Sequence, residues 1–142
     1  MAQFPEHIFQ VENNLSFLKE VETKIDNYFD WKVTICFYCA VHLANAHLSK
    51  FGLQYRQHNE VNFALNPETE TSLSKLPENE YVAYITLQQL SRRSRYLVNE
   101  KDGNLKNSNA FLTHEKHYER AKKHVYTLTY YLSSLYHLNL TK

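Results

Sequence analysis

Glycine and proline are scarce in this chain of 142 residues, which contains two Gly and three Pro. A hairpin-rich β fold needs turn residues roughly every 8–12 positions, so this scarcity disfavours such a fold. The few residues of this kind lie where helices are expected to begin or end: Pro5, Gly52, Pro67, Pro77 and Gly103. The sequence therefore predicts an all-α protein.

Other absences narrow the class of protein further. Two Cys do not make a disulfide scaffold, which fits a reducing cytoplasm. The N-terminus, MAQFPEHIF, lacks a basic segment followed by an apolar run, so we expect no signal peptide, no membrane association and a cytoplasmic location. The formal charge of +1 gives no general attraction to nucleic acid or membranes, so any positive surface must be local.

The sequence does contain one long apolar segment, residues 30–51. Residues 33–46 within it contain no Gly or Pro and no formal charge apart from His42, and Gly52 follows the segment. A helix that is apolar nearly all the way round must be covered on several sides. We therefore predict a core helix with Trp31 as an anchor near its start.

The hydrophobic spacing along the rest of the chain predicts four more helices. They span roughly residues 5–25, 58–65, 77–98 and 113–138. Asp26 or Asn27 is expected to cap the central helix, and Thr113 the last one. The helix from Pro77 should bury Ala83, Leu87, Leu90, Ser94 and Leu97, and the last helix Tyr118, Ala121, Val125, Leu128, Leu132 and Leu135.

Four main helices with short connections and one short helix predict an up-and-down bundle. We expect a single domain covering residues 1–142. Residues 99–109 are expected to form a polar linker in which Gly103 ends the preceding helix.

Cys36 and Cys39 have the CxxC spacing of redox and zinc sites. A redox pair needs a stabilised thiolate, and a zinc site needs a second pair of ligands. Both sulfurs instead lie in the most apolar stretch of the chain, so we interpret them as core residues. We expect neither a metal nor a cofactor.

The densest positive charge lies at Arg92, Arg93 and Arg95, directly before Tyr96. Guanidinium groups beside an aromatic ring are suited to phosphate binding and base stacking. A solvated face, or ion pairs with nearby carboxylates, is the alternative interpretation of the same pattern.

A second polar stripe lies on the last predicted helix, where His117, Arg120 and His124 share one face. Two turns separate the histidines, about 10 Å, which is too far for both to bind one metal ion. The stripe can face solvent, a second subunit or RNA. Within the apolar segment, His42 is expected either to be a hydrogen-bonded core residue or to take part in binding.

Several residue pairs in the chain occur in the order and spacing of a known family. Asp30 and Trp31 lead a helix with Phe37, Tyr38, Ala40 and His42, followed by Ala46, Gln57-His58, Leu90-Ser91 and Arg95-Tyr96. Over roughly residues 26–135 the chain resembles the HEPN domain (higher eukaryotes and prokaryotes nucleotide-binding), in particular its bacterial members. The resemblance implies a helical bundle that forms a homodimer.

Many HEPN proteins are metal-independent ribonucleases with an Arg and a His separated by four to six residues. The closest approach here is Arg120 to His124, with three residues between them, which argues against catalysis. We therefore predict a non-catalytic dimer that binds a nucleotide, RNA or a protein partner, for example a minimal nucleotidyltransferase. The predicted binding residues are Arg92, Arg95, Tyr96 and His42. The alternative is a divergent, toxin-type ribonuclease that uses Arg120 with His124 or His117.

Overall fold

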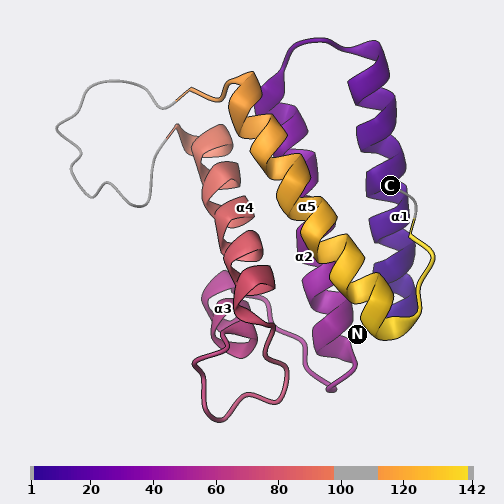
Figure 1. Ribbon diagram of the computed structural model, residues 1–142, viewed down its shortest axis with the longest axis vertical. Helices are drawn as coiled ribbons and strands as arrows, with labels where there is room; N and C mark the ends of the chain where they lie inside the picture. The colour runs from indigo at the N-terminus through magenta and orange to yellow at the C-terminus, as the bar shows by residue number, and fades with distance from the viewer. Residues whose placement is uncertain (1, 98–111, 141–142) are drawn as a thin grey trace, which may run out of the picture.

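The computed structural model describes residues 2–97 and 112–140. Figure 1 shows a bundle of long helices with a short helix at one end. The described residues form helices and no strands: α1 (Phe4–Lys24), α2 (Phe29–Ser49), α3 (His58–Leu65), α4 (Glu78–Tyr96) and α5 (Glu115–Tyr136). This confirms the predicted all-α class and helical bundle. None of these helices has the length and hydropathy that a bilayer span requires.

The helices alternate in direction along the bundle (Figure 1). α1 and α2 run antiparallel, α3 lies beside α2 near the start of α4, and α4 and α5 form a second antiparallel pair. α2 packs against α1, α4 and α5, and α4 also packs against α5. The first residues of α2 and α5 and the last residues of α4 therefore lie at the same end of the bundle.

Local chemistry accounts for several helix boundaries. Pro5 lies in the first turn of α1, where its missing N–H breaks no helical hydrogen bond. Gly52 follows α2 with φ +70, a conformation that glycine adopts without strain, and this turn lets the Leu53 N–H donate to the Leu48 carbonyl at 3.1 Å. Pro77 directly precedes α4, as its position in the sequence predicts.

The predicted caps were wrong at two helices. α2 begins after Tyr28, which adopts a left-handed conformation (φ 63), and neither Asp26 nor Asn27 is its cap. α5 begins after His114, whose N–H donates to Nδ1 of His117 at 2.9 Å. The hydroxyl of Thr113 pairs with that of Ser94 at 2.9 Å, so it joins α4 to the start of α5.

α2 is the core helix that the sequence predicts, but only on three of its sides. Cys36 and Cys39 are completely buried, and burial raises the pKa of Cys39 to about 12, which confirms that they are core residues rather than reactive thiols. The expectation that Trp31 is a buried anchor was wrong. Trp31 is 65% exposed and Tyr38, seven residues later on the same face, is 45% exposed. No helix of the described chain covers that face, because α1, α4 and α5 occupy the other three.

Three residues expected in the core lie outside it. Ser94 is partly exposed, and Leu97 is 48% exposed because it follows the last turn of α4 in a left-handed conformation (φ 56). Leu135 is 45% exposed because the next residue, Tyr136, turns inwards towards His47 of α2. The linker predicted around Gly103 lies outside the described residues.

His47 connects three segments at the end of the bundle where α2 stops. The carbonyl of Ser74 can only accept, so Nε2 of His47 carries the proton and donates to it at 2.9 Å. Nδ1 then accepts from the hydroxyl of Tyr136 at 2.7 Å. The Ser74 hydroxyl in turn donates to the Ala64 carbonyl at 3.0 Å, which fixes the loop between α3 and α4.

Candidate functional site

The structure brings together three of the predicted binding residues at the end of α4. The guanidinium carbons of Arg92 and Arg95 lie 5.7 and 5.1 Å from the ring centroid of Tyr96. Arg95 also lies 5.7 Å from the ring centroid of Phe37 on α2. These distances are typical of cation–π contacts. We call Arg92, Arg95, Tyr96 and Phe37 the arginine–tyrosine cluster.

Phe37 is the buried base of this cluster, and rings from three segments surround it. The ring centroids of His58, Tyr38 and Tyr84 lie 5.7, 6.2 and 6.2 Å from that of Phe37. Tyr38 of α2, His58 of α3 and Arg95 of α4 therefore meet around one ring. Tyr96 is 57% exposed, so its ring remains accessible beside two positive charges.

His42, the fourth predicted binding residue, contacts a different helix. Its Nδ1 lies 3.3 Å from Nδ1 of His7 on α1, and one of the two must carry the proton that they share. Burial lowers the pKa of both rings, and the neighbouring His7 lowers the pKa of His42 further. His42 thus joins α1 to α2, whereas the arginine–tyrosine cluster joins α4 to α2.

The polar stripe on α5 meets Arg93 of α4 and forms a second cationic group. Nε of Arg93 donates to the Leu112 carbonyl at 3.0 Å. Burial lowers the pKa of Arg93, and the charge of Arg120 lowers it further. His117 is only 6% exposed, and burial together with Arg93, Lys116, His114 and Arg120 lowers its pKa to about 4.

His117 and His124 therefore differ in what they can do. Nδ1 of His117 already accepts the N–H of His114, and its ring is buried, so it serves to cap α5. His124 is half-buried, and burial, Arg120 and Lys123 lower its pKa, so it is neutral at pH 7 and able to accept a proton. Arg120, one turn earlier, is exposed and able to bind a phosphate.

Positive charge is concentrated at this end of the bundle. Residues 92–96 and 114–124 carry seven Arg and Lys and two Glu, or +5 in a chain of formal charge +1. Lys32 adds a buried ammonium here, 5.1 and 5.5 Å from the ring centroids of Phe29 and Tyr118. Lys32 was not among the residues predicted from the sequence, because a lysine in the first turn of a helix is ordinarily exposed.

Metal binding finds no support within residues 2–97 and 112–140, where no group of three His, Cys, Asp or Glu could hold an ion. The comparisons with known proteins add no assignment. No protein-family model, curated protein or solved structure matches the chain significantly. The resemblance to HEPN domains thus stays a prediction from the sequence.

Proposed function

We propose that this protein is a non-catalytic helical bundle that binds single-stranded RNA or a nucleotide through Arg92, Arg95 and Tyr96. The observation that supports this proposal is the position of two guanidinium groups over one exposed tyrosine ring. A guanidinium binds phosphate oxygens in a forked geometry, and a ring with an open edge or face can stack on a base. Protein groups thus provide both parts of a nucleotide-binding contact.

The local charge supports the same proposal. The concentration of Arg and Lys at this end of the bundle would attract a polyanion although the whole chain is nearly neutral. The alternative is structural, because Arg95 over Phe37 also holds α4 on α2. Binding and stability must therefore be measured on the same variants.

The test is fluorescence anisotropy of a labelled single-stranded RNA with the wild type and with the double variant Arg92→Ala, Arg95→Ala. We expect at least about a ten-fold loss of affinity, since stacking and charge contacts each contribute roughly 1–3 kcal/mol. If each arginine contacts one phosphate, the slope of log K against log salt should fall by about 1.4. Circular dichroism should show unchanged helicity.

A matched control loses two charges elsewhere. Lys24→Ala with Lys75→Ala removes two exposed lysines, one at the end of α1 and one before α4, and should retain most of the affinity. Unchanged affinity in the arginine variant would exclude Arg92 and Arg95 from binding. A protein partner, such as the minimal nucleotidyltransferase that the resemblance implies, would then be the better proposal.

A second candidate function is metal-independent RNA cleavage by Arg120 and His124. A neutral histidine one turn from an exposed arginine favours it, although the spacing departs from that of HEPN ribonucleases. Cleavage of single-stranded RNA in the presence of EDTA, abolished in His124→Ala, would support this function. His117→Asn serves as the control because His117 is buried. No cleavage by the wild type, or equal cleavage by His124→Ala, would exclude it.

The uncovered face of α2 is our proposed homodimer interface. It continues onto α1 and the connection between them as a stripe of uncharged exposed side chains: Phe17, Ile25, Tyr28, Trp31 and Tyr38. An exposed apolar stripe of this kind marks an interaction site, and the lack of charge suits pairing with its own copy. Tyr38 also contacts Phe37, so such a dimer would bring two arginine–tyrosine clusters to one interface.

Sedimentation velocity at micromolar concentration tests the dimer. We expect the wild type to sediment as a dimer and Trp31→Glu to sediment as a folded monomer, because the stripe cannot bury an unpaired charge. Leu73→Glu is the control, since Leu73 is 85% exposed and lies outside the stripe. A monomeric wild type, or a dimer that Trp31→Glu leaves intact, would contradict this interface. Membership of the HEPN family and a cytoplasmic location belong to the same proposal.

A further inference from the structure

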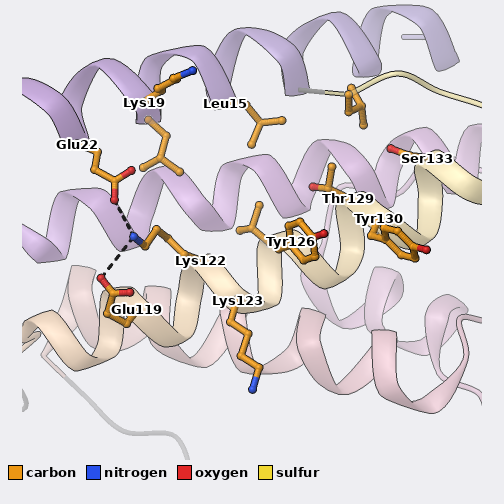
Figure 2. Close-up of a pocket in the computed structure, with 13 residues that line it drawn as sticks. Leu15, Lys19, Glu22, Glu119, Lys122, Lys123, Tyr126, Thr129, Tyr130 and Ser133 are labelled. Atoms are coloured by element: carbon orange, nitrogen blue, oxygen red, sulfur yellow. Dashed lines mark hydrogen bonds and ion pairs between the residues drawn. The ribbon is translucent and has the colours of Figure 1, made fainter. Parts of the chain in front are cut away.

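A second surface feature, unrelated to the arginine–tyrosine cluster, is the groove between α1 and α5. Both helices pack on α2 but make few contacts with each other. Figure 2 shows the groove that separates them, which has a volume of about 610 Å³. Sites for small organic ligands typically have volumes of roughly 300–1,000 Å³. The groove is therefore large enough to hold such a ligand.

The walls of the groove are mainly apolar. Leu18 of α1, Val125 of α5 and Leu140 of the C-terminal segment line it. Tyr126 and Tyr130 form one rim, with ring centroids 6.3 Å apart and planes inclined by 22°. Tyr130 is 65% exposed. An apolar chain seated in the groove would bury these surfaces.

Two hydroxyl groups on the same wall lack partners. Thr129 is only 8% exposed, and its Oγ1 has no hydrogen-bond partner in the described structure. One turn later, Oγ of Ser133 is also buried and, within those same residues, without a partner. Both residues line the groove and lie on the side of α5 that faces it (Figure 2). A buried hydroxyl without a partner destabilises the folded protein, so a polar ligand atom that pairs with it would offset that cost.

Charged side chains lie at the end of the groove that is opposite to Thr129 and Ser133. Nζ of Lys122 pairs with Glu22 at 2.7 Å and with Glu119 at 3.4 Å, as the dashed lines in Figure 2 show. Lys19 and Lys123 lie on either side of this ion pair, with their ammonium groups pointing out of the groove (Figure 2), and neither has an acidic partner among the residues that the structure describes. The residues that line this end include three lysines and two glutamates, a net charge of +1, and the side chains of Lys19 and Lys123 are long enough to turn towards an anionic group in the groove.

We propose that the groove binds a linear amphiphile of the medium-chain fatty acid class. Its anionic head would lie at Lys19 and Lys123, and its chain along the apolar wall. A hydroxyl or carbonyl further along would reach Thr129 or Ser133. Lys123 and Ser133 are ten residues apart on α5, roughly 15 Å, which suits a medium-length chain.

The experiment is isothermal titration calorimetry of the full chain with ω-hydroxydecanoate and with decanoate, each below its micelle concentration. We expect saturable binding of one molecule per chain, with ω-hydroxydecanoate bound about five-fold more tightly because its hydroxyl pairs with Thr129 or Ser133. Decyltrimethylammonium has the same chain and a cationic head, and should bind at least about ten-fold more weakly than decanoate.

Variants then assign the two ends of the ligand. Thr129→Val keeps the shape and removes the unpaired hydroxyl, so the ligand-free protein should melt no lower than the wild type. In this variant the preference for ω-hydroxydecanoate should fall. Lys19→Glu with Lys123→Glu should weaken decanoate binding at least about ten-fold. Lys24→Glu, on α1 but outside the groove, is the control and should leave binding unchanged.

Three results would overturn the proposal. The first is no saturable binding of either acid by the wild type. The second is equal binding of decyltrimethylammonium, which would show that the lysines do not recognise the head. The third is unchanged binding in both the Thr129→Val and the double-lysine variants, which would place the acids elsewhere.

Discussion

Lys32 and Lys50 lie near opposite ends of α2. Each contacts two aromatic rings, but Lys32 is buried and Lys50 is exposed. The ammonium of Lys32 lies 5.1 Å from the ring centroid of Phe29 and 5.5 Å from that of Tyr118. It is 3% exposed and lies at the end of the bundle that is rich in arginine and histidine. Lys50, at the other end, also lies over two rings but is exposed.

The Lys50 end is held by hydrogen bonds between neutral groups. Lys50 covers the rings of Phe4 and Tyr136 at 4.2 and 5.4 Å, and water still solvates it. Beneath it, His47 donates to the Ser74 carbonyl and accepts from the Tyr136 hydroxyl. Both nitrogens of His47 thus have a partner within the protein.

At the Lys32 end, by contrast, positive groups lower one another's pKa values. Burial is the largest cause of the lowered pKa values of Arg93 and His117, Arg120 lowers both further, and Arg93 also lowers the pKa of His117. Repulsion of this kind is relieved by an anion from outside the chain. The comparison therefore indicates that one end of the bundle stabilises the fold, while the other end is the better candidate for binding a polyanion.

The largest expected effect is at the neutral end. His47→Ala should lower the free energy of unfolding by about 4 kcal/mol, because it leaves a cavity and removes the partners of the buried Ser74 carbonyl and the half-buried Tyr136 hydroxyl. Tyr136→Phe removes one of the two hydrogen bonds and should cost about 1 kcal/mol. Urea denaturation measures both. A loss for His47→Ala no larger than that for Tyr136→Phe would show that the two ends do not differ in this way.

A pH effect of at most about 3 kcal/mol is expected at the charged end, from the His117 shift. The folded pKa of about 4 lies below the ordinary value of 6.5, so the unfolded chain binds the proton first as the pH falls. The contribution of His117 is therefore complete above pH 6.5, declines between 6.5 and 4, and is constant below 4.

His117→Asn removes this titration, and its side-chain oxygen can still accept the N–H of His114. Urea denaturation between pH 7 and 4 should show a flatter pH dependence for this variant than for the wild type. The other histidines with lowered pKa values, including His42 and His124, will keep part of the slope in both proteins. Equal slopes would show that His117 is not held neutral by its neighbours.

Replacing Lys32 and Lys50 separately by methionine compares the two ends directly. Lys32→Met should raise the free energy of unfolding by about 1 kcal/mol, because removing a buried charge offsets more than the lost cation–π contact. Lys50→Met, the matched variant, should change it by no more than about 0.5 kcal/mol, since its ammonium is solvated. A greater loss from Lys32→Met than from Lys50→Met would reverse our interpretation.

The positions of the helices were predicted from the sequence more accurately than the burial of their side chains. Pro5, Gly52 and Pro77 mark helix ends through local backbone chemistry, so the boundaries near them were predicted closely. The start of α2 was not, because Tyr28 adopts a left-handed conformation that tyrosine does not favour by itself. Exposure of Trp31 was also missed, since an apolar run does not reveal which of its faces the neighbouring helices leave uncovered.

The contacts of the candidate site also divide into those that the sequence predicts and those that depend on tertiary packing. Arg92 and Tyr96 are four residues apart on one helix, so their contact follows from helical spacing alone. The contact of Arg95 with Phe37 and the burial of Lys32 depend on how α4 and α5 pack on α2, which no local pattern encodes. Tertiary packing likewise leaves the hydroxyl of Thr129 buried in the groove between α1 and α5.

The smallest effect is expected for an ion pair whose side chains, unlike that of Lys32, are exposed. Lys24 Nζ lies 2.7 Å from Glu20 at one turn's spacing on α1, and both side chains are well exposed. Glu20→Ala should therefore lower the free energy of unfolding by less than about 0.5 kcal/mol, and by less still in high salt. Urea denaturation in low and high salt measures this difference. A loss above 1 kcal/mol would show that the distance between charges, rather than their burial, sets the energy of their interaction. It would weaken the comparison of Lys32 with Lys50.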